Sequence, residues 1–460
     1  MPRSTLLGVK RAIALVPVLA LVFATPPASA QALSIPFVKS KLANGLTVIL
    51  HEDHTVPVAV VNVTFDVGSR FEAPKRTGFA HLFEHLMFQG SEHYDADYFI
   101  PLQAVGARIN GTTNFDRTNY FEGVPAEELP LALWLESDRM GWLLPALTDE
   151  KLKNQQDVVR NERRQRYENR PYGMTWVWLF ENLYPEGHPY NVPTIGKHED
   201  LEAATLGDVQ TFCKTWYVPN NATLVVVGDV TPDEVKALAQ RYFGPIPKRD
   251  VPPAKNPLEM AEPGERLPPL HVQTNLPSVI LGFNVPSLAT AEDKRSVNAL
   301  RLISALLDGG YSARISTQLE RGEELVSGGS SSYDAYTRGD SLFTLTATPN
   351  LQKKKTVAQA EAGLWRLLDE LKAKPPSAEE LERIRAQVIA GVVYQRDSIT
   401  SQATAIGSLE TVGLSWKLMD TELAELQSVT AEDIQKAART YFTRERLSVA
   451  HVLPEETAHE

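Results

Sequence analysis

One pattern occurs twice in this sequence at an interval of 225 residues, and this repeat restricts the possible folds more than any other feature. Residues 201–217 and 426–442 both read L-x3-T-x2-D-[V/I]-Q-x4-T followed by two aromatic residues. Each copy then runs into an apolar, strand-like segment, 222–227 in one case and 447–452 in the other. A helix-like pattern that is followed by a strand in both places predicts two copies of one domain.

A second match lies upstream of the first. Phe65-Asp66-Val67 is followed by Lys75-Arg76 and an apolar helix, and Phe283-Asn284-Val285 is followed by Lys294-Arg295 and another apolar helix. The halves are separated by a charged stretch rich in proline, which disfavours a long helix. We therefore expect a first domain at 31–244, a linker at 245–269 and a homologous second domain at 270–460.

Within each half the pattern mixes strands and helices. Residues 61–67 alternate between apolar and polar side chains, which is typical of a half-buried strand. Further strands are expected at 46–50 and 118–124. Helices are expected at 126–140, 149–168, 201–217 and 231–243. Hairpin-like strands with helices grouped between them favour an α+β class with antiparallel sheets.

The first copy of the apolar helix carries H-x-x-E-H in His81-Leu82-Phe83-Glu84-His85. Residues i and i+4 lie on the same face of a helix, so both imidazoles can bind one tetrahedral Zn²⁺. Glu84 then lies beside the metal, where its carboxylate can accept a proton from water. The plain alternative is a core helix with hydrogen-bonded histidines, but three ionisable groups on a short apolar helix would be costly to bury.

This helix is expected to span 77–90, with Thr77 as its N-cap and Gly90 at its end. The second copy has Leu300, Ile303 and Ser304 where the first has His81, Glu84 and His85. We therefore expect one metal site per chain, in the first half. Structural zinc sites usually have four Cys or His ligands, and this pattern does not offer four.

A site with two histidines needs a third protein ligand, and the helix predicted at 149–168 offers several acidic residues. At this point the chain resembles the pitrilysin/insulinase family of inverted-motif zinc peptidases, in particular its short branch with mitochondrial processing peptidase subunits and bacterial relatives. The resemblance implies that Glu162, 77 residues after His85, completes the site. Asp157 and Glu168 are alternatives, and Glu162 could instead be a solvated charge. Some relatives have an acid where this chain has Gln155.

The resemblance also implies how a peptide binds, as a strand added to the edge of the catalytic sheet. Asn110-Gly111-Thr112-Thr113 matches the family's binding segment by its place between the zinc helix and Tyr120. Pairing through the main chain would suit any extended peptide. The alternative is an ordinary turn that contains glycine.

The family's second half usually supplies an arginine and, seven residues later, a tyrosine, which bind the substrate. In this chain Glu320 and Ser327 stand at those positions, and a shift by one residue gives Arg321 and Gly328. Neither alignment provides the pair. Either the enzyme is weak alone, or another chain provides these groups. We favour the second, because the resemblance implies two-chain enzymes in which a homologous partner subunit carries the arginine and the tyrosine.

Residues 1–30 are typical of a signal peptide, with a basic start, an apolar stretch and Ala28-Ser29-Ala30 before Gln31. Its removal takes away three positive charges and no negative ones, so the formal net charge moves from −11 to −14. That acidity argues against nucleic acid as the main partner. No apolar run elsewhere is long enough to span a membrane. Cys213 is the only cysteine, so no internal disulfide can form.

These features together predict an exported, periplasmic zinc endopeptidase that cleaves unfolded peptides and forms the catalytic subunit of a two-chain enzyme. His81, His85 and Glu162 would bind one Zn²⁺, and Glu84 would act as general base. The alternative is a non-catalytic assembly or peptide-binding subunit, which the missing arginine and tyrosine would suit.

Overall fold

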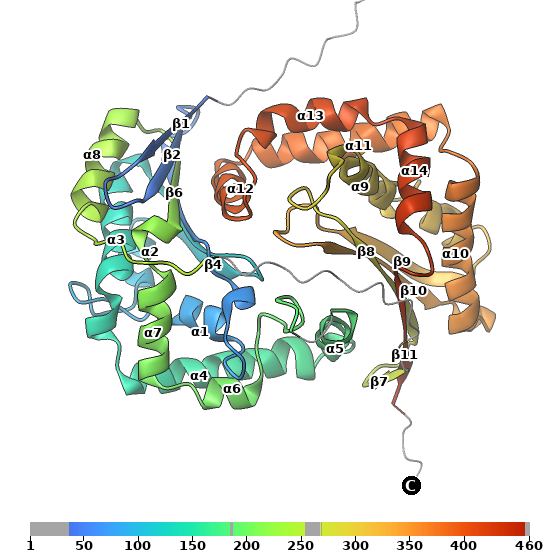
Figure 1. Cartoon of the computed structure of the whole chain (residues 1–460), viewed down its shortest axis with the longest axis horizontal. Coiled ribbons are helices and arrows are strands. Elements are labelled where there is room, and N and C mark those ends of the chain that lie inside the picture. Colours follow the sequence, from blue (N-terminus) through green and yellow to red (C-terminus); the bar gives the residue numbers. More distant parts are fainter. Residues whose placement is uncertain (1–35, 185–186, 254–266, 268, 456–460) are drawn as a thin grey trace, which may run out of the picture.

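The two halves that the repeat predicts are visible as two sheets, each with its own helices (Figure 1). The computed structural model describes residues 36–184, 187–253, 267 and 269–455. The expected signal peptide and most of the expected linker lie outside these residues. The class is α+β, as predicted.

The first sheet belongs to the half that carries the H-x-x-E-H motif. Its strands are β1 (Phe37–Lys41), β2 (Thr47–Glu52), β3 (Val58–Phe65), β4 (Arg108–Thr113), β5 (Thr118–Pro125) and β6 (Ala222–Gly228). Their order is β1-β2-β6-β3-β5-β4, and neighbours are antiparallel except for the parallel pair β2 and β6. Alternate residues of β3, such as Val61, Val63 and Phe65, lie in the main core of this half. Strand β4 is the last strand at one edge.

The second sheet repeats this order. Its strands are β7 (Leu270–Val272), β8 (Ser278–Val285), β9 (Val326–Tyr333), β10 (Ser341–Pro349) and β11 (Leu447–Pro454). Their order, β7-β11-β8-β10-β9, corresponds to β2-β6-β3-β5-β4, and β7 and β11 are again parallel. Phe65 pairs with Ala222, and Phe283 pairs with Leu447, which are the segments that the sequence repeat aligns. The internal duplication is therefore confirmed strand by strand.

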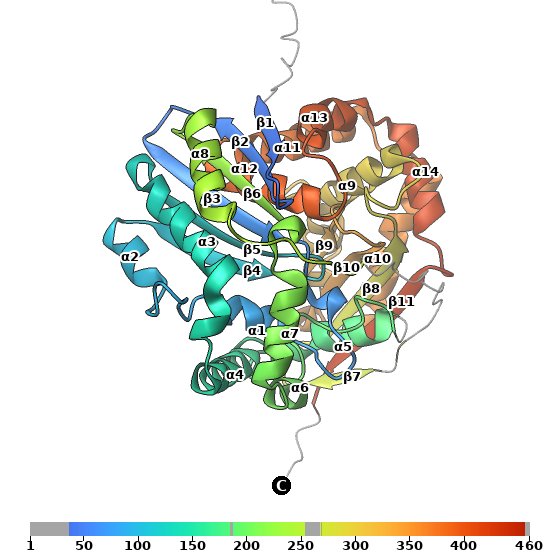
Figure 2. The same cartoon turned by 60° about the vertical axis from the view of Figure 1, so that its left-hand side comes forward.

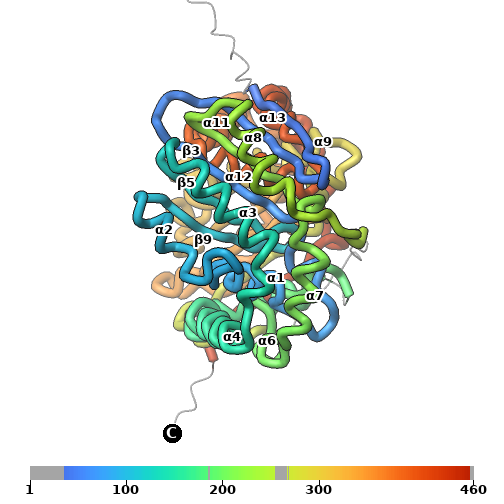
Figure 3. Tube along the Cα trace, turned by 90° about the vertical axis from the view of Figure 1, so that its left-hand side faces the viewer, coloured from blue at the N-terminus to red at the C-terminus, as the bar shows by residue number. Residues whose placement is uncertain are grey.

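Each half has its own helices, and most of them lie outside the space between the two sheets (Figure 1). In the first half they are α1 (Phe79–Leu86), α2 (Phe99–Ala104), α3 (Leu129–Ala146), α4 (Asp149–Arg163), α5 (Gly173–Leu183), α6 (His198–Glu202), α7 (Leu206–Trp216) and α8 (Pro232–Phe243). In the second they are α9 (Lys294–Asp308), α10 (Val357–Ala373), α11 (Ala378–Arg396), α12 (Ile399–Thr411), α13 (Leu418–Ser428) and α14 (Ala431–Tyr441). Helices α3, α7 and α8 form the outer layer of the first half (Figures 2 and 3). Among the described residues, no helix is long and apolar enough to cross a membrane.

The repeated T-x2-D motif turns out to be a helix start. Thr205 and Asp208 form a reciprocal capping box at the beginning of α7, and Thr430 and Asp433 do the same for α14. Each side chain accepts a hydrogen bond from the other residue's backbone, which satisfies two free N–H groups of the first turn. The single helix predicted at 201–217 is therefore wrong, because this cap starts a new helix after α6.

The halves exchange one helix each. Helix α12 of the second half packs on β3 and β6 at the inner face of the first sheet, where Ala403 and Ile406 share an apolar cluster with Val60 and Val225. Helix α5 of the first half packs in turn on the second sheet, where Leu179 lies against residues of β8 and β11. Both helices lie between the sheets, each beside the other half's strands (Figure 1). Neither half therefore has a complete apolar core without the other.

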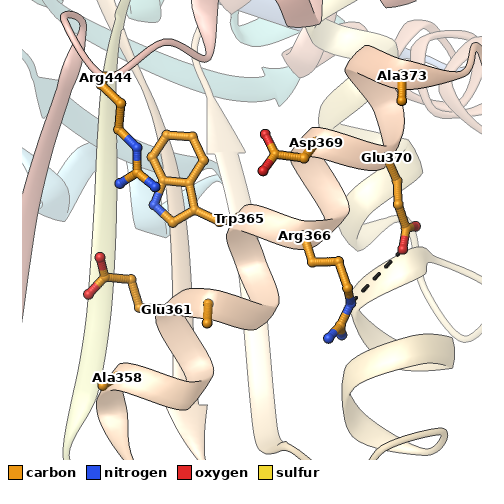
Figure 4. A pocket seen from close by; sticks show the side chains of 9 residues that line it. Ala358, Glu361, Trp365, Arg366, Asp369, Glu370, Ala373 and Arg444 are labelled. Carbon is orange, nitrogen blue, oxygen red and sulfur yellow. Dashed lines mark ion pairs between the residues drawn. The ribbon is translucent and has the colours of Figure 1, made fainter.

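Within the described residues, the outer layers of the two halves differ in one helix. In the first half α8 packs beside α3 and over β2, but in the described part of the second half no helix follows β11. The corresponding side of α10 is open, and there the Arg444 guanidinium stacks on the Trp365 ring, 3.6 Å from its centroid (Figure 4). The long arginine side chain thus covers part of the apolar surface that a helix covers in the other half.

Candidate metal centre

Helix α1 carries the H-x-x-E-H motif, but its ends differ from the prediction. It begins at Phe79 after Gly78, whose φ of +83° suits glycine, and it ends at Leu86 rather than at Gly90. Thr77 is not the cap, because its hydroxyl donates to Asp200 Oδ2 at 2.6 Å. The Glu72 carboxylate instead accepts from the backbone N–H groups of Gly78 and Ala80, both at 2.9 Å.

His81, His85 and Glu162 converge in space. The Nε2 atoms of His81 and His85 lie 3.8 and 3.2 Å from Glu162 Oε2. One ligand atom from each residue lies within 4.8 Å of the others. Helix α1 supplies both histidines and α4, which packs against it, supplies the glutamate. The spacing in the sequence thus corresponds to a real cluster.

Two features prepare these side chains for a cation. Burial lowers the pKa of His81 to about 4, with a further contribution from His85, so its imidazole is uncharged at neutral pH and keeps a lone pair on one ring nitrogen. The Arg166 guanidinium contacts Glu162 Oε1 at 2.8 Å, which leaves Oε2 facing the histidines. The first effect keeps a ligand atom unprotonated, and the second turns a carboxylate oxygen toward the histidines.

Zn²⁺ fits this donor set. Metal–ligand bonds of about 2.0–2.1 Å in a tetrahedron place neighbouring ligand atoms about 3.3 Å apart. The two histidine Nε2 atoms lie at similar distances, 3.8 and 3.2 Å, from Glu162 Oε2. Two neutral imidazoles and one carboxylate are typical of catalytic zinc sites, which keep a fourth position for water. His81, His85 and Glu162 line a cavity of about 460 Å³, so the fourth position would be open to solvent.

Glu84 lines the same cavity beside the two histidines. Its carboxylate is largely buried, and this burial raises its pKa, which makes it a stronger base. Thr113 Oγ1 donates to Glu84 Oε2 at 2.5 Å. A methyl group at Gly111 would come within 3.1 Å of Glu84 Cγ, so the glycine lets β4 approach the carboxylate closely.

The four residues expected to bind a peptide form most of β4, a strand rather than a turn. Asn110, Gly111, Thr112 and Thr113 all line the cavity. Strand β4 pairs with β5 on one side only, so its other side is a free edge within the described residues. Asn110 Oδ1 accepts from the backbone N–H of Gly111 at 3.0 Å. The structure therefore places these residues where an added strand would run past Glu84.

The alternative third ligands lie elsewhere. Asp157 pairs with Arg160, and Glu168 accepts from Arg163 Nε and contacts His198 Nε2. Gln155 lines the cavity, and its amide donates to Asn154 Oδ1 at 2.8 Å. Neither alternative acid joins the cluster, so among the described residues Glu162 is the acid that faces both histidines.

Among its described residues, the second half has none of the groups that form this centre in the first half. Leu300 and Ile303 are fully buried apolar residues, and Ser304 shares a hydrogen bond with Ser331 at 2.8 Å. At the same distance from the helix N-cap, α11 has Gly391 where α4 has Glu162. Glu320 and Ser327 lie at the end of a short helical turn and at the start of β9, and the Glu320 carboxylate accepts from Ser316.

Three contributions to the centre were not foreseen from the sequence. Arg166 fixes Glu162, Glu72 caps the motif helix, and the Thr113 hydroxyl contacts Glu84. Arg166 and Glu162 are four residues apart on neighbouring helical turns, a spacing that could have predicted their pairing. The other two contacts join separate elements, and no local pattern signals them.

Known proteins resemble this chain over most of its length. The family model described as insulinase (peptidase family M16) matches residues 47–178, and the one described as peptidase M16 inactive domain matches residues 203–388. A zinc protease of Helicobacter pylori, PqqE, is 30% identical over 407 residues, which cover 87% of this chain and 89% of that protein. The beta subunit of the mitochondrial processing peptidase of Lentinula edodes is 23% identical over 88% of each chain.

Solved structures show the same fold. A protease from Helicobacter pylori superimposes with a TM-score of 0.82 at 26% identity, covering 92% of this chain and all of that one. The first half of the periplasmic protease PqqL from Escherichia coli gives a TM-score of 0.75 at 16% identity, covering 91% of this chain and 92% of that one.

Proposed function

Because this chain belongs to the insulinase family of peptidases (peptidase family M16), we propose that it is a zinc endopeptidase. The observation that carries the proposal is the convergence of His81, His85 and Glu162 within 4.8 Å, with Glu84 beside them in one cavity. A purely structural role would not require a buried carboxylate next to three converging metal-ligand atoms.

The residues divide the chemistry between binding and proton transfer. His81, His85 and Glu162 would hold Zn²⁺, which polarises a peptide carbonyl and acidifies water. Glu84 accepts the proton of the attacking water and later passes it to the leaving amine. Its raised pKa favours this transfer, because a stronger base takes the proton more readily.

Extended peptides are the substrates that this geometry favours. A peptide added to the free edge of β4 gains affinity from main-chain hydrogen bonds and needs an unfolded conformation to do so. Asn110, Gly111, Thr112 and Thr113 would pair with it, and its scissile bond would pass Glu84. Folded proteins present few free strands of this kind.

The test of catalysis compares the purified chain with its Glu84→Gln variant. The variant should keep its zinc, because Glu84 is not a ligand, and should lose about 10²–10⁴-fold in peptide cleavage rate. Elemental analysis measures the zinc content. A quenched fluorescent peptide reports the cleavage rate. Equal cleavage by both proteins would show that Glu84 does not carry the proton.

We also propose that a homologous chain completes the enzyme. Glu320 and Ser327 occupy the positions where the family supplies an arginine and a tyrosine, so these positions do not offer the donors that the family uses for the developing oxyanion. Each such donor can contribute about 2.7–4 kcal/mol of transition-state stabilisation. The isolated chain should therefore cleave peptides slowly, and a partner with that pair should raise the rate steeply.

The measurement is the cleavage rate of the chain with and without the homologous partner. Replacing the partner's arginine or tyrosine should cancel the gain. Full activity of the monomeric chain alone would contradict the two-chain proposal. A complex that forms but stays inactive would instead favour the rival function, a non-catalytic peptide-binding subunit.

Export to the periplasm is the last part of the proposal. It rests on the basic and apolar pattern of residues 1–30 and on Ala28-Ser29-Ala30 before Gln31. Cell fractionation and N-terminal sequencing test it together. The expected result is a periplasmic protein that begins at Gln31, and a cytoplasmic protein that keeps residues 1–30 would contradict it.

A further inference from the structure

The side chain of Thr113 has a contact that main-chain peptide binding does not require. Thr113 Oγ1 lies 2.5 Å from Glu84 Oε2 and 3.3 Å from Thr118 Oγ1. The Thr118 hydroxyl donates its proton to the Val67 carbonyl at 2.9 Å, so toward Thr113 it can only accept. Thr113 has one proton for two acceptors, and the closer acceptor is a carboxylate, which forms the stronger hydrogen bond. The proton of Thr113 is therefore directed to Glu84.

This hydrogen bond selects which oxygen of Glu84 remains available. Oε2 is held against β4, and no described residue donates a hydrogen bond to Oε1. Gly111 lies on the same side of Glu84, where an added Cβ would come within 3.1 Å of Glu84 Cγ and 3.3 Å of Oε1, so the missing side chain leaves room for the carboxylate. A carboxylate with one oxygen fixed loses the freedom to rotate about its last bond, and the other oxygen keeps one direction.

The second half provides an internal comparison. Strand pairing aligns β4 with β9, so that Thr113, which pairs with Thr118, corresponds to Tyr333, which pairs with Phe343. The Tyr333 hydroxyl donates to the Pro286 carbonyl instead. The sequence repeat places Ile303 at the position of Glu84. The half without the carboxylate is thus also the half without the threonine, as expected if the two residues act together.

We propose that Thr113 is a positioning residue, whose hydroxyl orients the Glu84 carboxylate for proton transfer. The proposal rests on the peptidase function proposed above. Because Thr113 belongs to the edge strand, a peptide that pairs with β4 also fixes the residue that orients Glu84. Binding of the substrate and alignment of the base are then linked through one side chain.

The test replaces the hydroxyl with a methyl group of similar size. Thr113→Val should lower kcat about 10- to 100-fold and change KM less than about 3-fold, since a hydrogen bond to a charged group is lost while the strand stays intact. Thr113→Ser keeps the hydroxyl and should stay within about 3-fold of the unchanged chain. Thr211→Val is the control, because the Thr211 hydroxyl is exposed on α7 and donates within its own helix.

Two readouts separate this proposal from the proposed function. Zinc content should be the same in all four proteins, and crystal structures should show the Glu84 carboxylate turned away from β4 only in Thr113→Val. An unmoved Glu84 with unchanged kcat in that variant would overturn the proposal, and so would loss of its zinc. If the unchanged chain cleaves no peptide even with its partner, the proposed function fails, and the position of Glu84 in the crystals still decides the role of Thr113.

Discussion

The two halves share one fold and differ at the few positions that bear chemistry. Five strands follow the same order in both sheets, and both halves have the same capping box before their last common helix. The first half has His81, His85 and Glu162 around a cavity, whereas the second has Leu300, Ser304 and Gly391 at the corresponding positions. The comparison shows that the fold does not depend on the metal ligands, because the second sheet and its helices form without them.

The two halves also depend on each other for their apolar cores. The inner face of each sheet is covered by a helix of the other half, α12 on the first and α5 on the second. The half without ligands is therefore not dispensable. It completes the core on the inner face of β3 and β6, in the sheet whose edge strand β4 carries Gly111 and Thr113. This explains why a duplicated domain can lose its site and still be needed.

The largest effect is expected from a pair of substitutions at equivalent positions. His85→Ala should reduce zinc from about one ion per chain to none, because two remaining ligands hold zinc poorly. Ser304→Ala, at the same place in the second half, should leave zinc unchanged, since Ser304 only bonds to Ser331. Elemental analysis of both proteins checks this. Equal zinc in the two variants would remove the distinction between the halves.

A smaller but still large effect is expected at the third ligand. Glu162→Gln should weaken zinc binding about 10- to 100-fold or more, because a neutral amide replaces the carboxylate that faces both histidines. Glu168→Gln is the matched control on the following turn, where the carboxylate contacts Arg163 and His198. Competition with a zinc chelator measures both affinities. A greater loss of zinc affinity in Glu168→Gln than in Glu162→Gln would mean that the third ligand is wrongly assigned.

The sequence predicts this centre only in part, because some of its contacts join residues that are far apart in the sequence. His81 and His85 are four residues apart on one helix, so local geometry alone places them together. Glu162 needed the family resemblance, because 77 residues of chain separate it from His85. The contact between Thr113 and Glu84 depends on how β4 packs against α1, and nothing local to either segment indicates it.

The fold was predicted to a similar extent. The repeat gave the two halves and their corresponding strands, since the same apolar pattern was present in each copy. The exchange of α5 and α12 could not be predicted, because an amphipathic helix shows which face is buried but not which sheet covers it. The predicted start of α1 was also wrong, since Glu72 caps this helix from a preceding loop.

The helix exchange predicts a loss of stability from one methyl group. Gly407 of α12 lies so close to the first sheet that an added Cβ would meet Thr64 Oγ1 and Asn62 Nδ2, both of them buried. Gly407→Ala should therefore lower the free energy of unfolding by about 1–3 kcal/mol. Urea unfolding followed by fluorescence measures it. Unchanged stability would argue against close packing of α12 on this sheet.

The smallest effect, with the opposite sign, is expected at the position that corresponds to Glu162. Gly391 is exposed in the interior of α11, and an added Cβ would have no neighbour within 4 Å. Gly391→Ala should raise the free energy of unfolding by about 0.5–1 kcal/mol, because alanine favours the helix more than glycine does. The same urea experiment serves as the check. A destabilised variant would show that the second half uses this position after all.

The central claim is that one half binds zinc and the other does not, and anomalous X-ray diffraction at the zinc edge tests it most directly. Crystals of the chain grown with zinc should show one strong anomalous peak within bonding distance, about 2.0–2.2 Å, of His81 Nε2, His85 Nε2 and Glu162. No peak should appear near Leu300, Ser304 and Gly391. A missing peak in the first half, or an equal one between α9 and β9, would contradict the account.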